Sequence, residues 1–162
     1  MKKYVVAIGP NAVDEYYRCD HWPLMGEKVF MEYITSKAGG MIPNAASIMA
    51  GYGVKTYVLD TLGNDNYTKF ILDDLEEHEI DTSFIEIKDD MPNTRTHIIL
   101  AENERTIFIV KNKKPSLKID KNKELLLQNA TYIYSTINDM KNLENPEQII
   151  LKLKESNVRI AY

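Results

Sequence analysis

Apolar residues gather in short runs that alternate with longer amphipathic stretches. Four runs are sufficiently β-branched or aromatic to predict buried strands, at residues 4–8, 54–59, 132–137 and 158–162. Several stretches between them repeat apolar residues every three or four positions, which is the period of a helix with one buried face. Strands that alternate with helices predict an α/β fold, built on a mostly parallel sheet with helices on both faces.

Weaker strand signals lie between these runs. Residues 27–36 carry apolar side chains on both sides of an extended segment, which predicts a strand covered on both faces. Residues 82–87 also have strand character. Residues 94–101 and 105–110 flank a short polar turn at 102–104, so we expect a hairpin. Further helices are expected after Asp65, over 121–128 and from Asn145 onward.

The stretch of residues 37–65 has the densest local signals, because it contains five of the seven glycines of the chain. Gly39 and Gly40 lie where a loop meets a helix that begins near Pro43, so the backbone there can bend or let a ligand approach closely. This helix is expected to end at Gly51 and Gly53. Its predicted buried face consists of Ala45, Ile48, Met49 and Tyr52.

These features resemble the N-terminal signature of the ribokinase-like (PfkB) carbohydrate kinases. The matching positions are Gly39-Gly40, Asn44, Ala46, Gly53 and Gly63-Asn64-Asp65. Residues 9–14 resemble the first strand of that family with its substrate-binding aspartate, and residues 22–27 resemble the segment that leads into the family's lid. The resemblance runs over residues 4–110. It implies a ribokinase-like (Rossmann-like) sheet and a small β lid with strands roughly within 15–36 and 94–110.

The resemblance also implies a substrate site. Its residues are Asp14, Gly39, Gly40 and Asn44. A carboxylate at Asp14 can accept hydrogen bonds from two hydroxyls of a sugar, and the Asn44 side chain offers both a donor and an acceptor. Without the resemblance, Asp14 reads as a solvated carboxylate in a turn, and Asn44 as a helix-start cap beside Pro43.

The second part of the chain lacks signals for nucleotide binding. No glycine follows Gly63, and the later Gly-Ala-Gly-Asp motif of the resembled kinases is missing. The chain ends inside the apolar run 158–162, whereas termini are usually polar. We therefore expect residues 1–162 to be the N-terminal part of one ribokinase-like domain without its ATP-binding half. The complete enzyme is expected to use ATP and Mg²⁺, and this chain alone to hold no catalytic residue, cofactor or metal and to be inactive.

Composition narrows the class of protein. The chain is 44% hydrophobic and 27% charged, and its 162 residues are enough to bury a core. A net charge of -4 argues against nucleic acid as a partner. No apolar run has the length of a membrane helix, so no membrane partner is expected. The single cysteine, Cys19, excludes an internal disulfide and fits a cytoplasmic location.

The expected partner is a small sugar or nucleoside. Met41 leaves no lysine between the glycine pair and the asparagine, which favours an unphosphorylated substrate. The resemblance allows a homodimer through the lid strands, and the apolar C-terminal run predicts oligomerisation or poor solubility. Two alternatives remain open. One is a non-catalytic module that binds a small polyol, and the other is an unrelated Rossmann-like domain in which Asp14 and Asn44 need not converge.

Overall fold

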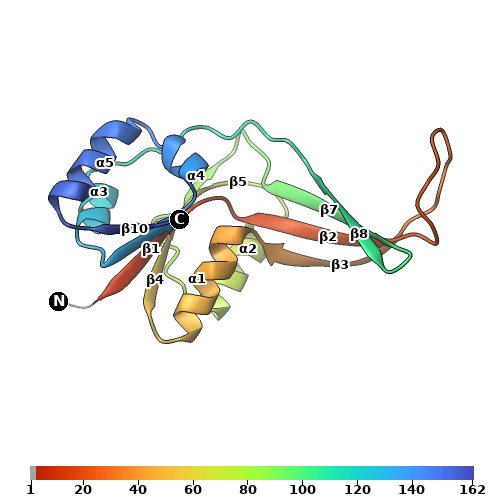
Figure 1. Ribbon diagram of the computed structural model, residues 1–162, viewed down its shortest axis with the longest axis horizontal. Helices are drawn as coiled ribbons and strands as arrows, with labels where there is room; N and C mark the ends of the chain where they lie inside the picture. The colour runs from red at the N-terminus through yellow and green to blue at the C-terminus, as the bar shows by residue number, and fades with distance from the viewer. Residues whose placement is uncertain (1–2) are drawn as a thin grey trace.

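A parallel four-stranded sheet lies at the centre of the body of the molecule (Figure 1). The computed structural model describes residues 3–162. The strand order is β10-β9-β1-β4. The strands are β1 (Tyr4–Ile8), β4 (Lys55–Leu59), β9 (Tyr132–Ser135) and β10 (Arg159–Ala161). The register pairs β1 in parallel with both β4 and β9, so β1 is central and its carboxyl end is flanked by loops from both neighbours.

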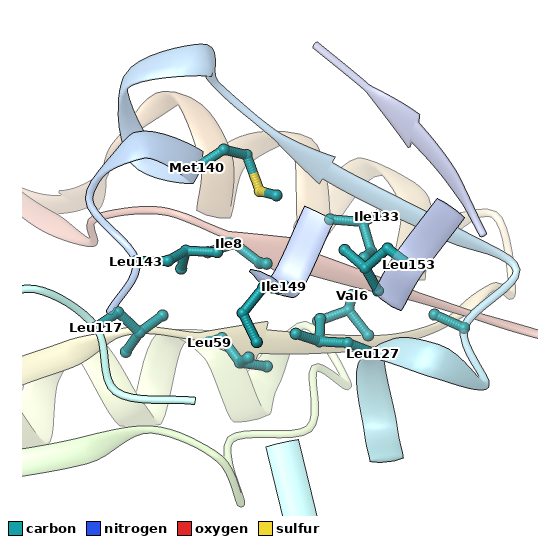
Figure 2. Packing of buried hydrophobic residues seen from close by; sticks show 11 residues of the cluster. Val6, Ile8, Leu59, Leu117, Leu127, Ile133, Met140, Leu143, Ile149 and Leu153 are labelled. Carbon is teal, nitrogen blue, oxygen red and sulfur yellow. The ribbon is translucent and has the colours of Figure 1, made fainter. Parts of the chain in front are cut away.

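Helices cover both faces of this sheet. The helices are α1 (Met41–Gly51), α2 (Thr68–Glu77), α3 (Lys121–Gln128), α4 (Ile137–Lys141) and α5 (Pro146–Glu155). Successive side chains of β1 point to opposite faces, so Val6 and Ile8 join one core and Ala7 joins the other. The first core contains residues of α3, α4 and α5 (Figure 2). The second contains residues of α1 and α2.

A second sheet projects from the body and forms the lid (Figure 1). Its strands are β2 (Ala12–Arg18), β3 (Glu32–Gly39), β7 (Thr94–Ala101) and β8 (Glu104–Ile109), in the order β3-β2-β7-β8. Strand β2 pairs antiparallel with β3 and parallel with β7, and β7 and β8 form an antiparallel hairpin. A short parallel pair, β5 (Thr61–Gly63) with β6 (Glu86–Lys88), lies apart from both sheets. None of the five helices in residues 3–162 has the length and apolar character needed to cross a bilayer.

The predicted α/β architecture is confirmed, with a mostly parallel sheet, helices on both faces and a small lid. The expected helix at 121–128 has the predicted bounds, and Asp120 caps it by accepting a hydrogen bond from the Lys123 N–H. The expected hairpin is also present as β7 and β8.

The lid strands differ from the expected bounds. The resemblance implied lid strands roughly within 15–36, whereas β2 already begins at Ala12, so Asp14 lies inside a strand and not in a turn. The strand expected at 27–36 occupies Glu32–Gly39 instead. That strand is at an edge of the sheet, and most of its side chains are exposed or half-buried, so it is not covered on both faces in this chain.

Three smaller corrections concern helix faces and strand ends. Helix α1 buries Ile42, Pro43, Ala46 and Ala50, whereas Ile48 and Tyr52 of the predicted face are 63% and 85% exposed. Small alanines allow α1 to lie close to the sheet. The strand expected at 82–87 is only Glu86–Lys88, and the strand expected at 132–137 ends at Ser135, because Thr136 caps the short helix α4.

Candidate functional site

Strand β2 carries Asp14 from the body into the lid. The strand begins four residues after β1 ends, so Asp14 lies close to the junction of the two parts. Its side chain is half-buried. A Cβ atom built on Gly39 would lie 2.4 Å from the Asp14 Oδ2 atom. The carboxylate therefore occupies the space that a side chain at position 39 would fill, which explains why glycine is needed there.

Gly40 connects β3 to helix α1. Its φ of 115° lies in the region that favours glycine, and a Cβ there would lie 2.7 Å from the carbonyl oxygen of Pro10. Gly40 is the N-cap residue of α1, and no side chain caps this end of the helix. The N–H groups at the start of α1 consequently offer donors and a partial positive charge to a ligand.

Asn44 lies in the first turn of α1 and is exposed. Its backbone N–H donates to the Gly40 carbonyl at 3.1 Å, and its side chain does not cap the helix, so the cap interpretation is not supported. Within residues 3–162, no hydrogen bond joins the Asn44 side chain to the other three predicted residues. The structure thus brings Asp14, Gly39 and Gly40 into contact, and places Asn44 one turn into the adjoining helix.

A cavity of about 500 Å³ lies near this junction, at the carboxyl ends of β1 and β4, but none of the four predicted site residues, Asp14, Gly39, Gly40 and Asn44, lines it. Pro10 connects the junction with the cavity. Its carbonyl oxygen lies where a Cβ on Gly40 would come within 2.7 Å, and Pro10 is also part of the cavity lining. The polar residues of the lining are Asp60, Thr61, Thr94, Lys111, Asn112, Lys114, Asn138, Asp139 and Asn142. Ligands of open α/β sheets bind at this end of the strands, so the position agrees with a binding role.

Asp60 forms the fixed part of the cavity wall. It is 3% exposed and accepts hydrogen bonds from the Asn11 N–H at 2.8 Å, the Asn11 Nδ2 at 2.9 Å and the Thr61 N–H at 2.7 Å. It also forms an ion pair with the Lys114 ammonium. Both Asp60 oxygens are engaged, so Asp60 holds the Lys114 ammonium at the cavity. Sequence reasoning missed Asp60, although it directly follows a buried strand.

Helix α4 supplies the opposite wall. Asn138, Asp139 and Asn142 line the cavity there. Asp139 Oδ2 accepts a hydrogen bond of 2.6 Å from the Thr136 hydroxyl, which itself caps α4. The Asp139 carboxylate is thereby oriented, with its second oxygen available. No sequence pattern predicted this wall, because α4 is only five residues long and only Thr136 separates it from strand β9.

The described residues do not fit a metal ion or a nucleotide phosphate. Within residues 3–162, no group of three or more His, Cys, Asp or Glu side chains is placed to hold a metal. No glycine-rich turn follows Gly63.

Two curated relatives align with most of the chain. A ribokinase of Bacillus subtilis (strain 168) is 28% identical over 107 residues, which is 66% of this chain and 36% of the relative. A ribokinase of Staphylococcus aureus (strain COL) is 30% identical over 112 residues, which is 67% of this chain and 36% of the relative. The chain therefore matches little more than a third of the length of these relatives.

Solved structures confirm the ribokinase-like fold. An Arabidopsis thaliana ribokinase complexed with ribose and ATP gives a TM-score of 0.83 at 20% identity, covering 99% of this chain and 53% of that chain. A fructokinase of Halothermothrix orenii gives a TM-score of 0.76 at 18% identity, covering 97% of this chain and 56% of that chain. The chain thus spans about half of the fold in each of these structures.

The family follows from a match that covers nearly the whole chain. The family model of the pfkB family carbohydrate kinases matches residues 2–156, which include the lid, the Gly39-Gly40 junction and both walls of the cavity. This protein belongs to the pfkB family of carbohydrate kinases.

Proposed function

We propose that this chain is the substrate-binding part of a kinase that phosphorylates a hydroxyl of a sugar or related small molecule with ATP. The observation that carries the proposal is the Asp14 carboxylate, which occupies the space that a side chain at Gly39 would fill and lies four residues after Pro10, a residue of the cavity lining. Family membership supports the reaction class. Matched relatives extend well beyond this chain, so the ATP site is assigned to a part of the enzyme that these residues do not provide.

In this function, Asp14 and Asn44 hold and orient the substrate. The carboxylate accepts hydrogen bonds from two sugar hydroxyls, and the start of α1 donates N–H groups to a third. The lid sheet excludes water that would otherwise compete with the sugar as the acceptor. The chain thus supplies positioning, which is the main protein contribution to phosphoryl transfer besides charge stabilisation.

The substrate is proposed to be a neutral sugar or nucleoside. Two carboxylates of the cavity lining, Asp60 and Asp139, balance two ammonium groups, Lys111 and Lys114. The amides of Asn112, Asn138 and Asn142 are suited to hydroxyl groups. Such a lining offers no net positive charge for a phosphorylated substrate, which agrees with the absence of a lysine at Met41.

Isothermal titration calorimetry of the chain with ribose and with fructose tests the proposal. We expect binding of at least one sugar, and Asp14→Asn to weaken it by about tenfold, because the amide accepts fewer hydroxyl hydrogen bonds. Asp20→Asn is the matched control, since Asp20 is an exposed lid carboxylate away from the glycine pair. Equal affinities of the wild type and Asp14→Asn would overturn the assignment.

A second measurement addresses activity. The chain incubated with ATP, Mg²⁺ and the bound sugar is expected to form no sugar phosphate, because residues 64–162 hold no glycine for a phosphate loop. Turnover by the pure chain would contradict this expectation. If a longer natural product also binds sugar without turnover, the non-catalytic binding module becomes the better proposal.

A further inference from the structure

A buried carboxylate lies on the face of β2 opposite to Asp14. Glu15 is 5% exposed. Its Oε1 atom accepts a hydrogen bond from the Tyr67 hydroxyl, and its Oε2 atom accepts one from the Tyr17 hydroxyl at 3.0 Å. The same Oε2 atom lies 2.9 Å from Nδ1 of His97. The hydrogen-bond and ion-pair partners of Glu15 thus come from three neighbouring elements, β2, β7 and the start of α2.

Tyr67 connects this cluster to the body of the molecule. It is the N-cap residue of α2, and it packs against the body core that contains Ile71 and Leu75. Glu15 and His97, in contrast, belong to two paired strands of the lid sheet, where they face each other in register. The Glu15–Tyr67 hydrogen bond is therefore a direct side-chain link between the lid and the body.

A second set of hydrogen bonds joins the segment before β7 of the lid to the segment before α2 of the body. Asp65 accepts hydrogen bonds from the backbone N–H of Asn93 at 2.8 Å and from its side chain at 2.7 Å, immediately before β7 begins. The Arg95 guanidinium lies near both Glu15 and Asp65, and its charge contributes to lowering the pKa of each. Burial raises the pKa of Glu15, but the hydrogen bonds from Tyr67 and Tyr17, together with the charges of His97 and Arg95, lower it by more, so Glu15 is an anion at neutral pH.

A buried anion is a costly way to join two surfaces, because an apolar contact of similar volume stabilises at least as well. The main effect of the hydrogen bonds of Glu15 is therefore to fix the orientation of the lid relative to α2, and not to add stability. Asp14 and Glu15 are neighbours in a strand, so their side chains point to opposite faces and Glu15 cannot touch a ligand held by Asp14. Any shift of Glu15 nevertheless moves Asp14 along with the strand.

We propose that Glu15 is a positioning residue that fixes the lid against α2 and thereby holds the Asp14 carboxylate beside Gly39. The proposal rests on the substrate-binding role proposed for Asp14. Tyr67 is the body-side partner in this arrangement, and His97 and Tyr17 are the lid-side partners. Figure 1 shows β2 running continuously from the body into the lid, which makes this strand the part that transmits the orientation.

A double-mutant cycle on sugar affinity tests the proposal. Glu15→Gln is expected to raise the sugar Kd about tenfold in the wild-type background and to have no further effect in the Asp14→Asn background, because it acts through Asp14. Tyr67→Phe removes the same hydrogen bond from the body side and leaves the carboxylate in place. We expect the same rise in the sugar Kd for this variant, and again no further effect in the Asp14→Asn background. Additive effects of Glu15→Gln and Asp14→Asn would mean that Glu15 acts independently of Asp14 and would overturn the proposal.

Amide hydrogen exchange provides a readout that needs no ligand. Exchange at β2 and β7 is expected to accelerate in both Glu15→Gln and Tyr67→Phe, while exchange at β1 and β9 stays unchanged. Glu32→Gln is the matched control, because Glu32 is exposed at the far end of β3. Unchanged exchange in the lid would overturn the link. Accelerated lid exchange in a chain that binds no sugar would instead overturn the proposed function and leave the lid–body link standing.

Discussion

Gly39 determines where the Asp14 carboxylate can lie. An alanine Cβ there would approach Asp14 Oδ2 to 2.4 Å and Cγ to 2.9 Å, so the carboxylate would have to turn away. We predict that Gly39→Ala weakens sugar binding by about tenfold, measured by calorimetry. Its free energy of unfolding should change little, because the backbone φ of Gly39 is not in the glycine-only region.

Gly51→Ala is the matched control for this substitution. A Cβ on Gly51 meets no atom within 4 Å, and Gly51 ends α1 without a positive φ. This variant should gain about 0.5 kcal/mol of stability from helix propensity and bind sugar like the wild type. Normal sugar affinity in Gly39→Ala would show that the position of the Asp14 carboxylate does not matter for binding.

Tyr67 makes stability depend on alkaline pH. The hydrogen bond to Glu15, together with burial, raises the pKa of Tyr67 from 10.0 to about 12. A group with a raised pKa contributes stability that is fully present below its unfolded pKa and is lost as the pH rises through the folded pKa. We therefore predict that this contribution to the free energy of unfolding is complete below pH 10 and declines up to about pH 12.

Urea unfolding of the wild type and Tyr67→Phe at several alkaline pH values checks this prediction. The difference between the two proteins should shrink as the pH rises, since phenylalanine has no proton to lose. Tyr4 and Tyr17 also have a raised pKa, so the comparison with Tyr67→Phe is needed to isolate one group. A difference that is independent of pH would show that Tyr67 does not donate to a carboxylate.

The turn after β5 depends on one buried side chain from the loop before β7. Asn93 is 1% exposed, and its amide bonds Gly63 in both directions, at 3.0 and 3.1 Å. It also donates to Asp65 and to the Thr68 hydroxyl. We predict that Asn93→Ala lowers the free energy of unfolding by about 3 kcal/mol, because several buried polar groups lose their partner together.

Chemical denaturation of Asn93→Ala and Asn129→Ala provides the measurement and its control. Asn129 is exposed and donates a single hydrogen bond to Leu125, so its loss should cost well under about 1 kcal/mol. Similar losses in the two variants would contradict the central role of Asn93. The sequence pattern did not identify Asn93, because its partner Gly63 lies thirty positions away.

Local periodicity predicted the body better than the lid. The central strand β1 is recognisable as a continuous apolar run, because both of its faces meet helices. The lid strand β2 mixes buried Val13 with the polar Asp14 and the buried anion Glu15, so it has neither pattern. Its pairing with β7 joins segments about eighty residues apart, which no local signal can reveal.

The candidate site was likewise predicted only in part from the sequence. The resemblance located Asp14, Gly39, Gly40 and Asn44 from short motifs, and the structure brings the first three together. Asp60 and Asp139 could not be predicted, because their importance arises from tertiary partners: Asn11 and Lys114 for Asp60, and the cap of a five-residue helix for Asp139. Residue-type patterns find backbone requirements, whereas cavity walls depend on which loops meet.

At the scale of the whole molecule, we consider two surfaces of residues 3–162 for contact with another chain. Strand β10 is an edge of the body sheet. The lid has two edges, β3 and β8, and large exposed apolar side chains, among them Phe30 at 98%, Phe108 at 56% and Tyr33 at 55%. Isolated apolar residues on a surface are ordinary, but Phe108 belongs to the lining of a hollow of about 860 Å³, together with Tyr17, Trp22 and Met31.

We predict that the chain forms a homodimer through the lid. Phe108 pairs in register with His97, on the lid face opposite to Asp14, so pairing through this face leaves the candidate site free. Phe108→Lys is expected to give a monomer in sedimentation velocity, because it places a charge in an apolar contact. Leu151→Lys is the matched control, since Leu151 is 61% exposed on α5 in the body. Association that survives Phe108→Lys and disappears when β10 is blocked by Ile160→Pro would place the contact at the open sheet edge and contradict pairing through the lid.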